Sequence, residues 1–138
     1  MAIVVDTSFV LALLRAADVN HSAARAWYET LDDDLVTSPL TVAEMDYMLA
    51  RHAGVRSVEA LRRDLESGAY AVRWWADAMS ETIAIARERP GLGLADASLV
   101  ALAARLRTDA IATFDHRRFR SLTMASGQYF TVLPADGP

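Results

Sequence analysis

Two amino acids are missing from this sequence, and each absence excludes a class of chemistry. Without cysteine, the chain can form neither a disulfide nor a thiolate metal site. All 14 basic residues are arginine, because lysine is absent as well. This excludes a P-loop lysine on a phosphate, a Schiff base and a lysine general base.

Hydrophobic runs of membrane-spanning length are also missing. The longest runs, such as 9–14 and 99–104, are far too short to cross a bilayer. The first residues have neither the basic flank nor the cleavage site of a signal peptide. We therefore expect a cytoplasmic protein with no membrane partner.

Length and charge set further bounds. With 138 residues, of which 53% are hydrophobic, the chain fits one domain over 1–138. The net charge of −4 does not favour a nucleic-acid partner, since phosphate contacts dominate such binding. If a metal ion neutralises four carboxylates, however, the remaining 14 acids balance the 14 arginines. The charge is thus compatible with RNA, without supporting it.

Hydrophobic periodicity predicts short strands separated by single or paired helices. The strands are expected at 2–5, 35–37, 70–75, 110–114 and 129–133. The helices are expected at about 8–16, 24–31, 38–52, 57–67, 79–89 and 95–107. Such alternation predicts an α/β fold with a mostly parallel central sheet and helices on both faces. Ligands of such sheets bind outside the carboxyl ends of the strands.

Three local details complete this prediction. Ser57 has the residue type of an N-cap for the fourth helix. Met79, Ile83 and Ala86 are expected to form the buried line of the fifth helix. The first helix is apolar almost all round, so it should lie in the core or at an interface.

Acidic residues follow two of the predicted strands. Asp6 comes directly after 2–5, and Asp115 directly after 110–114. If these strands are parallel neighbours, both side chains point into the same crevice.

Two further acids lie on apolar helix faces, where an uncompensated carboxylate is costly. Asp96 shares its face with Leu99, Val100 and Ala103. Glu44 shares its face with Leu40, Tyr47 and Met48, whereas Asp46 lies on the other side of that helix and is assigned no role.

Each acid also has an ordinary structural interpretation. Asp6 could cap the first helix, Asp96 could be favoured by the helix dipole, and Glu44 could pair with Arg51. Taken together, four such roles would not all place a carboxylate in one crevice. Like-charged carboxylates in close contact require a proton or a cation. Ligation by oxygen alone favours Mg²⁺ or Mn²⁺, ions that bind and activate phosphodiesters.

Four motifs in order resemble the PIN-domain nucleases, in particular their VapC-type toxin branch. The motifs are the opening 4–14, the helix segment 41–44, the run 93–99 and the strand end 112–115. The likeness covers essentially the whole chain. It implies a three-layer α/β/α sandwich that cleaves RNA endonucleolytically with Mg²⁺ or Mn²⁺.

The resemblance also implies roles for individual residues. Asp6 and Asp96 correspond to the surest metal ligands, and Asp115 binds a second ion or acts through water. Glu44 positions the attacking water, and the hydroxyls of Ser8 and Thr113 support the acids. Such toxins are inhibited by a cognate antitoxin and commonly form homodimers, which we expect here through the early helices.

The remaining candidates are arginines and tryptophans. Arg117 and Arg118 follow Asp115 and are expected to bind RNA phosphates, although arginine clusters are often only a solvated face. The pair Trp74 and Trp75 is expected in the core rather than stacked on bases.

Two other functions remain as alternatives. A phosphatase with Asp6 as nucleophile is disfavoured by Ser8 and by the absence of lysine. A catalytically silent PIN-like module that binds RNA or protein would be favoured by loss of one of the four acids, and all four are present.

Overall fold

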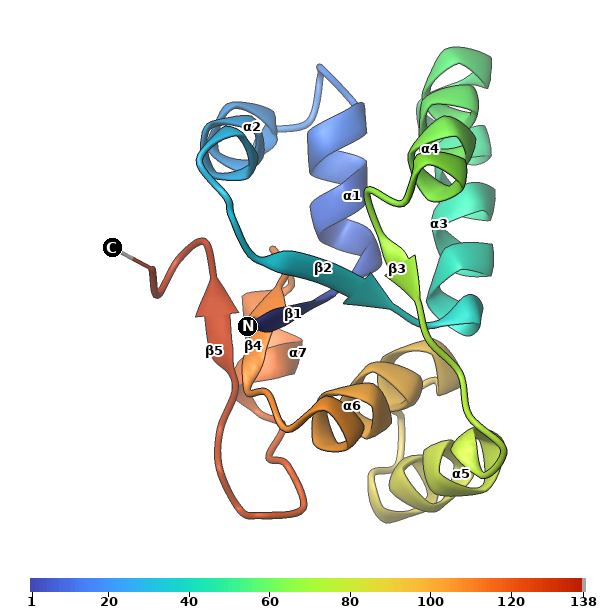
Figure 1. Ribbon diagram of the computed structural model, residues 1–138, viewed down its shortest axis with the longest axis vertical. Helices are drawn as coiled ribbons and strands as arrows, with labels where there is room; N and C mark the ends of the chain where they lie inside the picture. The colour runs from blue at the N-terminus through green and yellow to red at the C-terminus, as the bar shows by residue number, and fades with distance from the viewer. Residues whose placement is uncertain (138) are drawn as a thin grey trace.

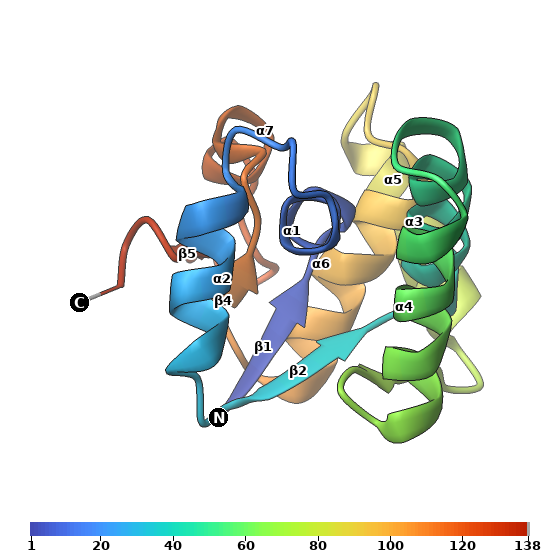
Figure 2. The same cartoon turned by 90° about the horizontal axis from the view of Figure 1, so that it is seen from above.

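The computed structural model describes residues 1–137, in which five strands form one parallel sheet (Figure 1). The strand order is β3-β2-β1-β4-β5, and every pairing is parallel. The strands are β1 (Ala2–Val5), β2 (Asp34–Thr37), β3 (Ala71–Val72), β4 (Ala110–Ala112) and β5 (Thr131–Leu133). Figure 2 shows β1 and β2 running in the same direction, with α1 beginning where β1 ends.

Helices cover both faces of the sheet and complete three layers (Figure 1). One face carries α1 (Thr7–Leu14), α2 (His21–Glu29), α3 (Pro39–His52) and α4 (Val55–Ser67). The other carries α5 (Ala78–Glu88), α6 (Leu94–Leu106) and α7 (His116–Arg120). The predicted α/β/α sandwich is therefore confirmed. Among residues 1–137, no helix is both long and apolar enough to cross a membrane.

Alternation along the strands divides the core in two. Ile3 and Val5 pack with Phe9 of α1, whereas Val4, between them, packs with Leu99 of α6. The reason is that successive strand side chains point to opposite faces. Helix α6 lies between the sheet and α5, and residues 96–103 of it are all buried. The apolar helix α1 was expected in the core or at an interface, and it packs in the first core.

Two predicted elements have other boundaries in the structure. The expected strand 70–75 is only Ala71–Val72, because the chain then leaves the sheet. Helix α4 begins at Val55 with Gly54 as N-cap, not with Ser57. Gly54 has φ 101°, which glycine adopts readily, and Ser57 donates its hydroxyl to the carbonyl oxygen of Leu14 at 2.8 Å.

Side-chain predictions failed at two positions. The buried line of α5 includes Ala78 and Thr82, while Met79 is 41% exposed. Small residues at this line allow α5 to pack closely on α6. Trp75 packs against the second core as expected, but Trp74 is 39% exposed.

Candidate active site

The predicted acids lie where the strand order reverses. Strands β1 and β4 are parallel neighbours at the centre of the sheet, and the connections leaving them run to opposite faces. The backbone N–H of Asp6 donates to the carbonyl oxygen of Ala112 at 3.0 Å, which fixes the two strand ends together. Such a switch point is where ligands bind in open α/β sheets.

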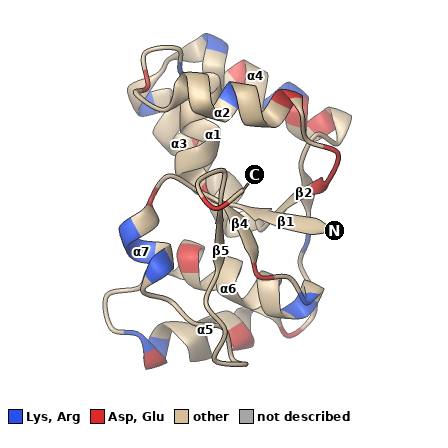
Figure 3. Ribbon diagram, turned by 90° about the vertical axis from the view of Figure 1, so that its left-hand side faces the viewer, with Lys and Arg blue, Asp and Glu red and all other residues tan. Residues whose placement is uncertain are grey.

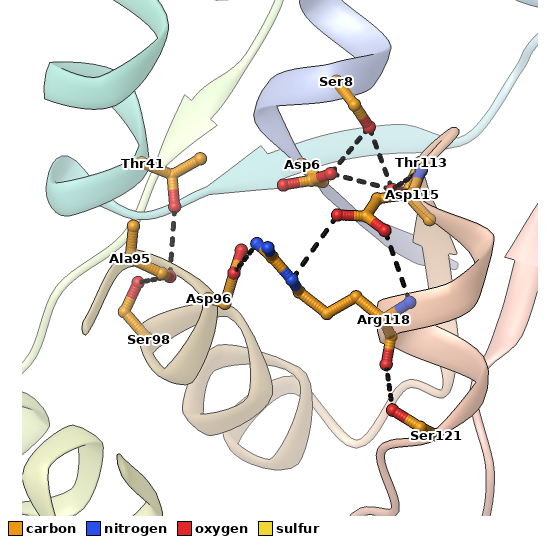
Figure 4. Close-up of polar contacts among 10 residues, drawn as sticks. All are labelled: Asp6, Ser8, Thr41, Ala95, Asp96, Ser98, Thr113, Asp115, Arg118 and Ser121. Atoms are coloured by element: carbon orange, nitrogen blue, oxygen red, sulfur yellow. Dashed lines mark hydrogen bonds and ion pairs between the residues drawn. The ribbon is translucent and has the colours of Figure 1, made fainter. Parts of the chain in front are cut away.

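Asp6 is held by two hydroxyl groups. Ser8 Oγ and Thr113 Oγ1 each donate to Oδ2 of Asp6 at 2.7 Å (Figure 4). Each hydroxyl has one proton, so both are used on the same carboxylate oxygen. Their own lone pairs accept from backbone N–H groups, Ser8 from Phe114 and Thr113 from Asp115, both at 3.0 Å. The supporting roles predicted for these two hydroxyls match this geometry.

This arrangement differs from a helix cap. Asp6 occupies the N-cap position of α1, but its side chain turns to Ser8 and Thr113. It is only 4% exposed, and burial raises its pKa. The two hydroxyl bonds oppose that rise, and the charge of Glu44 adds to it. Both hydroxyl bonds are made to Oδ2 of this carboxylate.

Asp96 is the second buried acid of the site. It lies in the first turn of α6 and is 5% exposed. Burial raises its pKa to about 6, and the negative charges of Asp6 and Glu44 add to the rise. Arg118 opposes it through its charge and a hydrogen bond. Asp96 is thus more than a surface acid at a helix N-terminus.

Glu44 is positioned differently from the prediction. Helix α3 buries Thr41, Met45 and Leu49, so Glu44 is on an exposed face, as is Tyr47 at 61%. Its negative charge nevertheless makes a small contribution to the raised pKa of both Asp6 and Asp96. Arg51, its alternative partner, donates to the Tyr47 hydroxyl at 3.5 Å.

A set of buried hydroxyls joins the helices that carry Glu44 and Asp96. Ser38 Oγ caps α3 by accepting from the backbone N–H of Thr41 at 3.1 Å. It also lies 2.6 Å from Ser98 Oγ, whose hydroxyl donates to the carbonyl oxygen of Ala95 (Figure 4). Sequence reasoning did not identify this link, because neither serine reveals a partner 60 residues away.

Asp115 reaches the cluster through an arginine. Its Oδ1 accepts from the backbone N–H of Arg118 at 3.3 Å and so caps α7. Its Oδ2 lies 3.4 Å from Nε of Arg118, whose Nη1 pairs with Asp96 (Figure 4). Figure 3 shows the basic residues of α7 beside α6. The structure therefore joins Asp96 and Asp115 through Arg118, and places Asp6 and Glu44 near enough for their charges to raise the pKa of Asp96.

The carboxylate oxygens of the site are the kind of ligand that a hard divalent cation prefers. Within residues 1–137, no three His, Asp or Glu side chains are arranged to hold a metal ion by themselves. Mg²⁺ does not need three, since it is commonly bound by one or two carboxylates together with waters and phosphates. Asp6 and Asp96 supply two buried carboxylates whose pKa values are raised chiefly by burial and further by neighbouring negative charges. A divalent ion bound to them would favour their charged forms.

A pocket beside Asp115 is lined by two arginines, which bring positive charge to the site. It has a volume of about 310 Å³ and is lined by Asp115, Arg117, Arg118 and Ser121. A pocket of about 510 Å³ lies at the amino ends of the strands, where Met1 and Thr108 line it. It contains none of the predicted site residues.

Known proteins resemble this chain along most of its length. A family model described as PIN domain matches residues 3–123. A protein of Mycobacterium tuberculosis named Ribonuclease VapC26 is 38% identical over 134 residues, which cover 95% of this chain and 99% of that protein.

Solved structures share the fold. The crystal structure of VapC20 of Mycobacterium tuberculosis, a sarcin-ricin loop cleaving toxin, superimposes with a TM-score of 0.77 at 24% identity. The superposition covers 83% of this chain and 90% of the VapC20 chain. A toxin-antitoxin complex from Klebsiella pneumoniae gives a TM-score of 0.65 at 18% identity, over 87% and 92% of the two chains.

Proposed function

Because the chain belongs to the PIN domain family, we propose that it is a divalent-metal-dependent endoribonuclease and the toxin of a toxin–antitoxin pair. One observation carries this proposal. The carboxylates of Asp6 and Asp96 are both buried at the switch point of the sheet, and each has a raised pKa to which the negative charge of another acid contributes. The 38% identity to Ribonuclease VapC26 supports RNA as the substrate.

Asp6 and Asp96 would hold Mg²⁺ or Mn²⁺, and Asp115 would bind a second ion or act through water. When bound, such an ion polarises a phosphoryl oxygen and lowers the pKa of water. Ser8 and Thr113 keep Asp6 in one orientation through its Oδ2, so that the ion meets a preorganised ligand. The bridge between Ser38 and Ser98 fixes α3 against α6.

Glu44 is the residue best placed to handle the proton of the attacking water. It is exposed to solvent and lies near enough to both buried acids to raise their pKa values. Water loses a proton as its oxygen bonds to phosphorus, and the departing 3′ oxygen gains one as its bond to phosphorus breaks. The products are a 5′-phosphate and a 3′-hydroxyl. Arg117 and Arg118 would contact the RNA backbone beside the cluster.

The partners of the proposal follow from the toxin role. An RNA-cleaving toxin in the cytoplasm has to be inhibited by a cognate antitoxin, and a structural neighbour was solved as a toxin-antitoxin complex. A homodimer remains part of the proposal. Half of α1 is buried in the core, and its partly exposed residues, such as Leu11 and Leu13, are those that could contribute to such an interface. Sedimentation of the purified protein measures the oligomeric state.

The proposal is tested by incubating purified protein with structured RNAs in Mg²⁺, in Mn²⁺ and in EDTA. We expect cleavage with either ion and none in EDTA. Asp6→Asn should remove the activity, and Asp46→Asn should retain it, because Asp46 pairs with Arg62 outside the cluster. Cleavage that persists in EDTA would overturn the metal mechanism. RNA binding without cleavage under every condition would identify the silent PIN-like module instead.

A further inference from the structure

Arg118 occupies an unusual position among the acids of the site. Its guanidinium pairs through Nη1 with Asp96 and through Nε with Asp115, whose Oδ2 is 3.4 Å away (Figure 4). The side chain of Arg118 is 52% exposed, whereas that of Asp96 is only 7% exposed. A solvent-accessible cation therefore reaches down to a buried carboxylate.

This pairing meets an electrostatic requirement of the cluster. Asp96 is buried beside the negative charges of Asp6 and Glu44, and an unpaired buried carboxylate is costly. A planar guanidinium can bridge two carboxylates, which the compact ammonium of lysine does less well. Arg118 supplies part of the positive charge that the buried acids require.

We propose that Arg118 is an internal counter-ion that competes with the divalent ion for Asp96 and turns to an RNA phosphate when the ion enters. This inference rests on the proposed function, because it concerns the same metal site. Arg118 contacts Oδ2 of Asp96, so an ion that binds this oxygen would displace the guanidinium, because two cations at one oxygen repel each other. The two cations are therefore alternatives at this oxygen.

The surroundings of Arg118 allow such a movement without repacking. Helix α7 is fixed by Phe119, which is fully buried and packs on Phe130 with ring centroids 6.0 Å apart. The cap of α7 uses the backbone N–H of Arg118 and not its side chain. The half-exposed side chain already lines the pocket of about 310 Å³ that it shares with Arg117. A phosphate in that pocket would meet both arginines.

Mn²⁺ binding tests the competition by calorimetry, with no RNA present. Arg118→Met removes the guanidinium and should tighten Mn²⁺ binding about tenfold, which corresponds to about 1.4 kcal/mol. Arg117→Met removes the same charge from the neighbouring residue and serves as the matched control, with a clearly smaller change expected. Arg118→Lys keeps the charge but bridges poorly, so its affinity should be intermediate.

Nuclear magnetic resonance of the arginine Nε–H groups follows the movement itself. Addition of Mg²⁺ should shift the Arg118 signal, identified by its loss in Arg118→Met. The Arg62 signal should stay in place, because its Nε is bonded to Asp46 at 3.0 Å outside the site.

Two results would overturn the inference while leaving the proposed function intact. The first is that Arg118→Met and Arg117→Met change the affinity for Mn²⁺ by the same amount. The second is that the Arg118 Nε–H signal does not shift at saturating Mg²⁺. If neither the wild type nor Arg118→Met binds Mn²⁺, the proposed metal site fails as well.

Discussion

Thr113 donates a hydrogen bond to Asp6 across 107 positions of the sequence, with 2.7 Å between Oγ1 and Oδ2. The same hydroxyl accepts from the backbone N–H of Asp115. One side chain at the end of β4 thus orients the acid that follows β1 and the backbone of the acid that follows β4. Removal of this hydroxyl should therefore affect both acids.

Thr113→Val replaces the hydroxyl with a methyl group of similar size and leaves Asp6 with one donor. We expect a loss of about 10- to 100-fold in RNA cleavage or in Mn²⁺ affinity, the usual effect of removing a group that orients a metal ligand. Unfolding should become easier by about 1 to 3 kcal/mol, because buried polar groups lose a partner. Cleavage rates, Mn²⁺ titration and urea denaturation measure the three effects.

Thr108→Val is the matched control. Thr108 is also buried, and it donates to the carbonyl oxygen of Ala2 at 2.7 Å, but at the amino ends of the strands. Its substitution should destabilise the fold without changing cleavage per folded molecule. Equal losses of activity in the two variants would show that Thr113 contributes stability only.

Asp96 should make the stability of the metal-free protein depend on pH. Its pKa is about 6 in the folded protein and 3.8 ordinarily, so between these values the folded state binds a proton that the unfolded chain does not. The free energy of unfolding should therefore fall as the pH rises from about 4 to 7, by about 1 to 3 kcal/mol from this residue. Asp96→Asn should flatten this part of the profile and be at least as stable as the wild type at pH 7.

Thermal melts with and without metal separate this role from a purely structural one. Mg²⁺ at ten times its dissociation constant should stabilise the wild type by about 1.4 kcal/mol, and Asp96→Asn by clearly less. A variant that melts below the wild type in EDTA, yet gains as much from Mg²⁺, would identify Asp96 as a structural N-terminal acid of α6.

Arg117 should contribute to RNA affinity in a salt-dependent manner. It is exposed and lines the pocket beside Asp115. Arg117→Glu should weaken RNA binding in EDTA and lower the salt slope by at least about 0.7 on single strands or 0.9 on duplex. Arg56→Glu reverses an exposed charge on α4 and should leave both quantities unchanged. Equal effects of the two substitutions would place the RNA path elsewhere.

Expression of the protein without an antitoxin should arrest bacterial growth. Asp6→Asn and Asp96→Asn should each relieve the arrest, because each removes a proposed metal ligand. Asp46→Asn should remain toxic, since it breaks only an exposed pair with Arg62. Circular dichroism checks that the variants are folded. Undiminished toxicity of both folded site variants would contradict the assignment of these ligands.

The sequence by itself determined the layers of the fold and the region of the site. Apolar segments such as 3–5 and 110–112 form the central strands, because runs with hydrophobic residues on both faces suit a sheet covered on both sides. Asp6 and Asp115 follow those strands directly, so parallel pairing placed them at one edge. These properties depend on residues that are close in sequence.

Edges and helix starts were less predictable. Residues 70–75, including Trp74, have a composition that favours a strand. The chain leaves the edge strand after Val72, however, so the residues that follow have no neighbouring strand to pair with. Ser57 has the residue type of an N-cap but gives its hydroxyl to Leu14 of α1. In both cases a contact from another element decided the outcome.

Only the tertiary structure decided how the acids are shared out. Periodicity placed Glu44 on an apolar face, but the packing of α3 buries the adjacent line of Thr41, Met45 and Leu49 and leaves Glu44 at the rim. The pairing of Arg118 with Asp96 spans 22 residues and two helices. Charge is not periodic along the chain, and electrostatic partners are chosen by distance and burial in the folded protein. The sequence therefore supplied the four acids, whereas the fold decided that Asp6 and Asp96 are buried, that Ser8 and Thr113 orient Asp6, and that Arg118 pairs with Asp96.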